Sequence, residues 1–320
     1  MDFTYRTIAL AAAAAAAVTL AAGSVAAKDS YKPSKITAFV AAGAGGGTDN
    51  FARTVQPMLE ERLGANVTIV NLPAASGAIA HQRTATAAPD GQSIEFASST
   101  LITSRAAGQN PIGLDMLTPV ARMQSDVLML VVNPEKYESF EAFMAAADAN
   151  PGTLIIGGTH AASVDRMAFL GLNEAAGLDL SFIPYDNKGA ASANLLSGNI
   201  DGMFNEISAI QGYMESGEMI PVLALAEERL EAYPNIPTTM ENGWDLTFGN
   251  ERGIFINAKT PPETIAAIEA VFEDIFNSEP YQAYAARTFL DVRPGWLGSD
   301  EYRAELEKNL AFFEELLADY

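Results

Sequence analysis

Cysteine is absent from all 320 residues, and histidine occurs only twice, as His81 and His160. The absence of cysteine excludes disulfides, a thiolate nucleophile and a lipid anchor on an N-terminal cysteine. Because zinc sites of the usual kind need cysteine or several histidines, we expect no metal, and we expect no cofactor. A chain without thiols is typical of the oxidising bacterial periplasm.

Basic residues are also scarce, with 19 Lys and Arg against 40 Asp and Glu and a net charge of −21. Such a charge repels nucleic acid and anionic lipid, so we expect neither as a partner. It also repels an anionic ligand at long range. Any anion site must therefore work through local N–H groups rather than through a basic field.

Long apolar runs are missing except at the N-terminus, where Arg6 precedes the alanine-rich segment 8–22 and the small residues 24–27. This pattern predicts a secretory signal peptide over residues 1–27, and hence a periplasmic protein. A transmembrane anchor is the alternative, but about 15 apolar residues are too few to span a bilayer.

Apolar strands alternate with helical patterns along the rest of the chain. Segments 36–41, 67–70 and 94–97 read as strands in the first half, and segment 154–156 begins a similar series in the second. The alternation predicts an α/β fold with largely parallel sheets, and the length suits two domains. The apolar run 127–132 is the expected crossing into the second domain.

A glycine turn stands between the first strand and the first helix. Four glycines fall within residues 43–47 and are followed by Thr48 and Asp49, before a helical pattern that starts at Phe51. This order places bare backbone N–H groups at the positive end of a helix, which is an anion site. One glycine would suffice for a plain structural turn, the alternative, so four favour a ligand close to the backbone.

Turns of small residues recur at residues 71–77 and, in the second half, at residues 157–163. Nucleotide binding is disfavoured, because Thr48 breaks the G-x-G-x-x-G spacing, no acid falls in 66–72 and no lysine follows the glycines. Because the strand–turn–helix unit occurs in both halves of the chain, we expect each half to supply one side of a binding site.

Hydrolase chemistry lacks its usual signals. There is no G-x-S-x-G elbow, and a triad would need one of the two histidines. His81 falls within a helical pattern and is interpreted as a packed or surface residue, whereas His160 lies in the second-half turn and suits a ligand contact. A hydrolase or lyase using Asp49, Asp165 and His160 would lack an activating pair, so we expect no catalytic residue and no enzyme.

Polar residues of the turns divide by charge. Asp49 and Asp165 would repel a carboxylate, so we expect them to brace their loops or to accept from a ligand hydroxyl. The neutral donors suit a carboxylate directly; they are Thr48, Ser76, Thr100 and Ser163.

Five motifs, in order, carry a family resemblance. They lie at residues 45–53 (G-G-G-T-D with a later A-R), 70–77, 88–91 (A-P-D-G), 184–201 and 234–243. Together they resemble the solute-binding proteins of tripartite tricarboxylate transporters, also called Bug-type receptors. The likeness runs over the whole mature chain.

The resemblance implies a two-lobed periplasmic binding protein of type II, the Venus-flytrap fold, in which each lobe is a mostly parallel sheet flanked by helices. Lobe 1 would comprise residues 28–125 plus 248–320, and lobe 2 residues 126–247. A small organic acid, such as a di- or tricarboxylate, would be held between the lobes by N–H groups and waters, with few charged side chains. A monomeric receptor would deliver it to a membrane transporter; a periplasmic sensor subunit with the same fold is the alternative.

The resemblance also implies ligand-binding residues, position by position. On lobe 1 they are Gly46, Gly47, Thr48 and Asp49, with Ser76 and Thr100; on lobe 2 they are Thr159, His160, Ser163 and Asp165, with Tyr185 and Asn205. The chain departs from the family pattern at Ala44, at Ala74 and Ala75, and at residues 186–188, where a glycine-rich loop is usual. These departures leave the identity of the ligand open.

Overall fold

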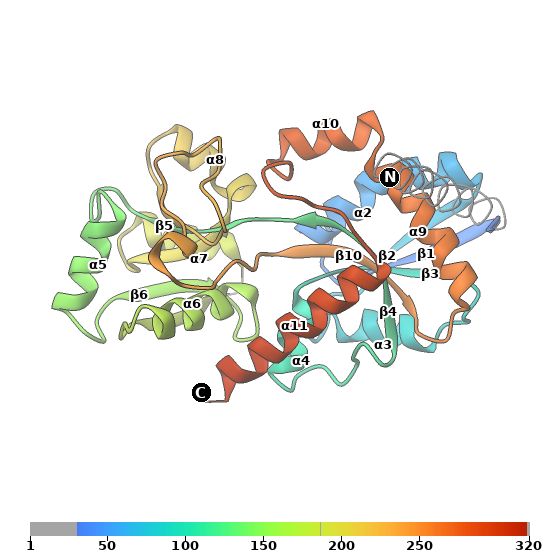
Figure 1. Cartoon of the computed structure of the whole chain (residues 1–320), viewed down its shortest axis with the longest axis horizontal. Coiled ribbons are helices and arrows are strands. Elements are labelled where there is room, and N and C mark those ends of the chain that lie inside the picture. Colours follow the sequence, from blue (N-terminus) through green and yellow to red (C-terminus); the bar gives the residue numbers. More distant parts are fainter. Residues whose placement is uncertain (1–30, 186, 319–320) are drawn as a thin grey trace, which may run out of the picture.

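The structure, a computed structural model, describes residues 31–185 and 187–318. Two sheets lie side by side, and each is flanked by its own helices (Figure 1). The expected signal peptide at residues 1–27 lies outside the described residues. Within the described part of the chain, no helix combines the length and apolar character needed to cross a membrane.

The first sheet has six strands in the order β11-β4-β10-β3-β1-β2. Its strands are β1 (Lys35–Val40), β2 (Asn66–Asn71), β3 (Ser93–Ser98), β4 (Leu117–Ser125), β10 (Glu251–Asn257) and β11 (Leu297–Gly298). The helices that accompany it in sequence are α2 (Gly47–Leu63), α3 (Ala78–Thr86), α4 (Thr100–Ala106), α9 (Pro262–Phe276), α10 (Glu279–Arg287) and α11 (Ser299–Leu317).

The second sheet has five strands in the order β7-β6-β8-β5-β9. They are β5 (Leu128–Val132), β6 (Ile155–Thr159), β7 (Ser181–Tyr185), β8 (Gly202–Glu206) and β9 (Ile220–Ala224). Its helices are α5 (Phe140–Ala149), α6 (Val164–Ala175), α7 (Lys188–Leu196) and α8 (Ile207–Glu215), followed by the short 3₁₀ helix η1 (Met240–Asn242).

Both sheets are mixed, which corrects the expectation of mostly parallel sheets. Strand β1 runs parallel to β2 and β3, and β6 runs parallel to β7 and β8, as strand–helix–strand units require. Strands β10 and β5 run antiparallel to their neighbours. The reason is that β5 and β10 each enter their sheet from the other one, so they begin at the edge where the parallel strands end.

The chain passes between the sheets twice, at residues 126–127 and through residues 225–250. As a result, the carboxyl ends of β1, β3, β6 and β8 and the amino ends of β5 and β10 share the space between the sheets. Loops at carboxyl ends of parallel strands are where ligands of open α/β folds bind. The lobe boundaries expected at residues 125/126 and 247/248 stay a prediction.

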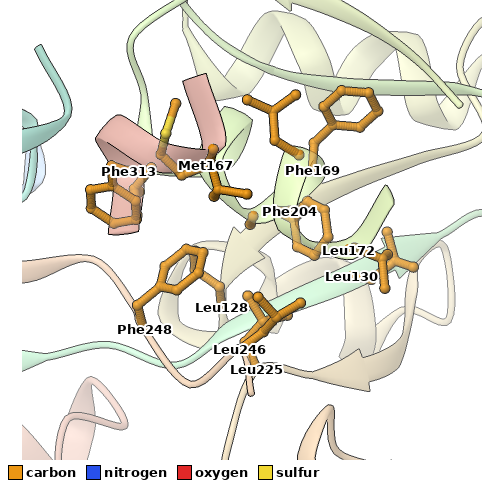
Figure 2. Close-up of a cluster of buried hydrophobic side chains, with 14 of the residues drawn as sticks. Leu128, Leu130, Met167, Phe169, Leu172, Phe204, Leu225, Leu246, Phe248 and Phe313 are labelled. Atoms are coloured by element: carbon orange, nitrogen blue, oxygen red, sulfur yellow. The ribbon is translucent and has the colours of Figure 1, made fainter. Parts of the chain in front are cut away.

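Apolar packing joins the two sheets on one side. A continuous buried cluster includes Leu128 of β5, Met167 of α6 and Phe313 of α11, together with Phe248 from the second crossing. Figure 2 shows Phe313 lying near Met167 and Phe248, and Figure 1 shows α11 running from the first sheet toward α6.

Candidate functional site

The amino terminus of α2 lies at the edge between the sheets, as the glycine turn predicts. Gly46 is its N-cap residue, and no side chain caps the helix. Gly47, the first helical residue, is exposed. Because the first N–H groups of a helix have no intrahelical partner, this turn presents uncommitted donors together with the positive end of a 17-residue helix.

Asp49 braces this turn. Its Oδ2 accepts hydrogen bonds from the backbone N–H of Gly45 and from Nε of Arg53, both at 2.8 Å, and its Oδ1 accepts from Asn71 at 2.8 Å. Burial alone would raise the pKa of Asp49, but these hydrogen bonds outweigh it and hold the pKa below its usual value. Asp49 is therefore ionised and stabilises the conformation of the glycine turn through these hydrogen bonds.

Asp165 plays the matching part in the second sheet. Its Oδ2 accepts from the backbone N–H of Thr159 at 3.0 Å and from the Thr159 hydroxyl at 2.7 Å. Ser163 is the N-cap of α6 and accepts from the backbone N–H of Arg166 at 3.2 Å. Each half of the chain thus holds one strand–turn–helix unit in place with a buried aspartate.

The remaining predicted residues lie near the ends of neighbouring strands and helices. Ser76 has a left-handed backbone (φ 55°), and Thr100 is the first residue of α4, where its hydroxyl accepts from Ser98 at 3.2 Å. His160 is exposed, and its backbone N–H donates to the carbonyl of Tyr185 at 3.2 Å. Asn205 is buried at the end of β8, where its side-chain oxygen accepts from the backbone N–H of Glu206 at 3.0 Å.

A buried set of charges, which we call the cleft charge cluster, was not predicted from the sequence. Its members are Arg252 of β10, Asp126 from the first crossing, Glu206 of β8, Lys188 of α7 and Asp165. This number of charged side chains differs from the few that the resemblance implies.

Contacts within the cleft charge cluster run from one sheet to the other. Arg252 forms an ion pair with Asp126 and lies 3.8 Å from Glu206 of the second sheet. Lys188 forms an ion pair with Glu206 and lies 3.6 Å from Asp165. The cluster therefore bridges the inter-sheet space.

Gly47 connects this cluster to the glycine turn. An ideal Cβ placed on Gly47 would lie 2.6 Å from Nη2 of Arg252, so the guanidinium sits against the bare backbone of the α2 amino terminus. Both residues line a cavity of about 540 Å³, together with Asn50, Arg53, Thr54, Gln124, Asp126, Ser208, Tyr284, Thr288 and Leu290. Most of this lining comes from elements around the first sheet, and Ser208 of α8 contributes from the second.

The structure brings some of the predicted residues together at this cavity. Gly47 lines it, and Gly46, Thr48 and Asp49 flank Gly47 in the same turn. Asp165 is linked to it through Lys188 and the cleft charge cluster. The others are not among its lining residues; they are Ser76, Thr100, Thr159, His160, Ser163, Tyr185 and Asn205.

The surroundings of the cluster shift the pKa values of two of its carboxylates in opposite directions. Burial raises the pKa of Glu206, but the charges of Lys188 and Arg252 and the hydrogen bonds donated by Lys188 and Asn250 outweigh burial and lower it to about 2. The pKa of Asp126 is raised, first by burial and also by the charge of Glu206, against the opposing effect of Arg252. Three carboxylates thus compete for two cations.

The cluster offers no activated nucleophile, and its acids are engaged in ion pairs. Among the described residues, no group of three or more His, Cys, Asp and Glu side chains could hold a metal ion. The arrangement suits capture of a charged small molecule rather than turnover of one.

Comparison with known proteins decides the family. A family model described as "Tripartite tricarboxylate transporter family receptor" matches residues 51–294, more than half of the chain. The chain belongs to this family. It is also similar to the protein BugT of Bordetella pertussis, with 28% identity over 221 residues, covering 68% of each chain.

Solved structures share the fold of this receptor. A TctC solute-binding protein from Polaromonas superposes with a TM-score of 0.78 at 24% identity, covering 91% of this chain and 100% of that one. MatC of Rhodopseudomonas palustris, described with bound malate, superposes with a TM-score of 0.73 at 22% identity over 88% of this chain and 98% of its own. The two-lobed α/β fold predicted from the sequence is confirmed.

Family membership also bears on activity. Members of this family are periplasmic solute-binding receptors, so the expectation of a non-enzymatic protein is confirmed at the level of the family. The hydrolase or lyase alternative falls with it. In the sequence, the one local sign of the cleft charge cluster is the pair Glu251 and Arg252, two charged residues at the start of an otherwise largely apolar strand.

Proposed function

We propose that this receptor captures a small organic acid between its two lobes in the periplasm and delivers it to a membrane transporter. The observation that carries the proposal is the convergence of the uncapped α2 amino terminus and the Arg252 guanidinium beside Gly47, at the cavity between the sheets. A helix amino terminus and a guanidinium are both complementary to a carboxylate. MatC with bound malate and a second R. palustris protein with adipate, TM-score 0.74 at 20% identity, support an acid as ligand.

In this proposal the acid first meets lobe 1. Its carboxylate accepts hydrogen bonds from the backbone N–H groups of Gly47 and Thr48, and Nε of Arg252, which has no hydrogen-bond partner among the described residues, adds a further donor. Ser76 and Thr100 would contribute hydroxyl groups from the neighbouring strand ends.

Lobe 2 then closes over the other end of the ligand. Thr159, His160 and Ser163, at the end of β6 and the start of α6, would contact the ligand from this lobe on closure, with Tyr185 and Asn205 as further contacts. Contacts that exist only when both lobes touch the ligand shift the population toward the closed form. We propose that the closed form, as a monomer without nucleic acid, docks on the transporter.

The energetics allow useful affinity. Hydrogen bonds to a charged group contribute about 1.5–3 kcal/mol each, so four or five of them contribute about 6–15 kcal/mol before ordering costs are subtracted. This range spans the roughly −8 kcal/mol of micromolar binding, so a single carboxylate site of this kind is compatible with micromolar affinity.

Isothermal titration calorimetry on the chain without residues 1–27 tests the proposal. The panel should contain mono-, di- and tricarboxylates, their neutral amides and a neutral sugar. We expect at least one acid to bind with a dissociation constant on the order of micromolar and its amide to bind at least tenfold more weakly. Binding of an amide or a sugar, with no acid bound, would contradict an acid-capturing function.

A further inference from the structure

The two crossings between the sheets touch each other at one point, which we call the hinge. The backbone N–H of Asp126 donates to the carbonyl of Asn250 at 3.2 Å, and an ideal Cβ on Gly249 would overlap the carbonyl oxygen of Asp126. Because these two segments connect the lobes, a rotation of one lobe against the other bends the chain at the hinge.

A second cavity lies on the opposite face of the hinge from the first. Glu251 and Arg252 are consecutive residues of β10, so their side chains point to opposite faces of the sheet. Arg252 lines the cavity beside Gly47, whereas Glu251 accepts a hydrogen bond from Arg122. Arg122 lines a cavity of about 710 Å³, which we call the hinge cavity. Because the two cavities lie on opposite faces, a rotation that widens one of them narrows the other.

Opposite charges line the two walls of the hinge cavity. The wall on the side of the first sheet carries three cations and one carboxylate, which are Arg122, Arg293, Lys308 and Glu305. The other wall is segment 226–231, which follows β9 and buries Ala226 and Leu230 in the core of the second sheet. It carries Arg229 and three carboxylates that we call the hinge-cavity acids, Glu227, Glu228 and Glu231. The two walls therefore attract each other across the cavity.

One cation on each wall is already compensated within its own wall. Arg122 donates to Glu305 at 2.8 Å, and Arg229 donates to Glu241 at 2.8 and 3.0 Å. Glu251 adds little charge behind Arg122, because its burial and its hydrogen bond with Glu305 raise its pKa to about 8. The attraction between the walls thus depends on Arg293, Lys308 and the hinge-cavity acids, which form no ion pairs within the described part of the chain.

Arg293 is the cation with the strongest need for a partner. Its Nη1 is buried and has no hydrogen-bond partner among the described residues, and it lies 3.4 Å from an ideal Cβ on Gly249 at the hinge. Burial lowers the pKa of Arg293, and the charge of Glu227 on the other wall is among the effects that oppose this shift. Because a buried donor without an acceptor is unfavourable, a conformation that brings an acid to Arg293 is stabilised.

We propose that the two walls of the hinge cavity form an electrostatic latch that stabilises the open receptor. Opening of the lobes on the side of Gly47 narrows the hinge cavity and brings the hinge-cavity acids toward Arg293 and Lys308. Closure around a ligand separates them again, so contacts with the ligand have to outweigh the latch. The latch rests on the hinge closure proposed above and adds the interaction that balances it.

Distance measurements on the mature chain without ligand test the latch. Because the chain has no cysteine, Ala209→Cys in α8 and Ala286→Cys in α10 place one spin label on each lobe, at exposed positions that line neither cavity. Both helices lie on the Gly47 side of the hinge, since Ser208 and Tyr284 line the first cavity (Figure 1). Double electron–electron resonance then gives the ratio of long, open distances to short, closed ones. Raising the salt concentration from about 10 mM to about 1 M should lower this ratio at least about threefold.

Charge variants of the two walls should act as salt does. Glu227→Gln and Arg293→Gln each remove one charge of the latch and should lower the open-to-closed ratio about threefold at low salt. Glu174→Gln and Arg83→Gln remove the same charges at exposed positions that line neither cavity, and should leave the ratio unchanged. The double variant Arg293→Glu with Glu227→Arg should recover the open population that either single reversal loses, which a purely structural role of Arg293 would not produce.

Circular dichroism first establishes that each variant is folded. If the Arg293 variants fail to fold, Glu227→Gln and Glu228→Gln, at exposed positions, decide the matter. A single distance in all proteins, or a ratio that neither salt nor the folded variants change, would overturn the latch. Because these samples contain no ligand, that result would leave acid capture standing, and the calorimetric panel described above decides acid capture separately.

Discussion

Gly47 and Arg252 approach each other so closely that a Cβ on Gly47 would lie 2.6 Å from the Arg252 guanidinium. Arg252 cannot easily retreat, because Asp126 and Glu206 hold it from the other side. The glycine of this turn is therefore required by a long-range contact, in addition to any requirement of the turn itself.

Gly47→Val should weaken acid binding strongly. The branched side chain would displace Arg252 and cover the first N–H groups of α2, so we expect at least a tenfold loss of affinity by calorimetry. Gly43→Val is the matched control, because a Cβ at Gly43 has no atom within 4 Å. Wild-type affinity in Gly47→Val would show that the turn has only a structural role.

Glu251 should make the free energy of unfolding fall as pH rises. Arg122 donates to both Glu251 and Glu305, so two carboxylates compete for one guanidinium. Burial, followed by the hydrogen bond with Glu305, raises the pKa of Glu251 to about 8. A carboxyl group whose pKa is raised in the folded state contributes its full stabilisation at pH values below its pKa in the unfolded chain. For Glu251 this contribution is lost as pH rises through about 8.

Melting temperatures measured between about pH 6 and pH 9 test this effect. Glu251→Gln should remove most of the decline across that interval, because glutamine has no proton to lose. Glu307→Gln, which removes an exposed carboxylate from α11, the helix that carries Glu305, should retain the decline. An identical decline in all three proteins would assign it to other groups.

Thr103 should influence the balance between open and closed forms. Its hydroxyl donates to the carbonyl of Ala162 at 2.8 Å, which joins α4 to the loop before α6. Thr103→Val keeps the shape and removes this inter-lobe hydrogen bond, worth about 1 kcal/mol, so ligand affinity should fall about fivefold. Small-angle scattering should show a larger mean radius without ligand.

Thr84→Val is the control for this substitution. Thr84 is equally buried, but its hydroxyl donates within α3, to the carbonyl of Ala80 at 3.1 Å. Its loss should lower the melting temperature without changing affinity. Equal affinity in the two variants would argue that Thr103 does not take part in closure.

Asp49→Asn should loosen the glycine turn. The substitution removes the ion pair with Arg53 and weakens the hydrogen bond from Gly45, and hydrogen bonds to charged groups contribute about 1.5–3 kcal/mol each. We expect a loss of roughly 2 kcal/mol in the free energy of unfolding and weaker ligand binding, measured by urea unfolding and calorimetry.

Asp90→Asn provides the comparison for Asp49, since Asp90 accepts two hydrogen bonds in an exposed turn from Gln92. It should change stability little and affinity not at all. The lowered pKa of Asp49 stabilises the folded state fully only at pH values above the pKa that this residue has in the unfolded chain. The difference in the free energy of unfolding between Asp49→Asn and wild type should therefore shrink as pH falls below about 4.

The sequence by itself determined the α/β class, the glycine turn at the start of α2, and the family. These features are encoded locally, since strand and helix patterns, turns and motifs involve residues within one segment. Asp49 and Asp165 were expected to brace their loops for the same reason: their partners at Gly45 and Thr159 are near neighbours in the chain.

Only the tertiary structure decided the electrostatics of the cleft. Arg252 and Asp126 are separated by 126 positions, and Glu206 reaches Arg252 from the other sheet. These charges meet because β10 inserts between β3 and β4 from the second crossing, an antiparallel placement that no local pattern specifies. The net charge of a buried site depends on which distant side chains share it, and that is a property of strand order rather than of any one segment.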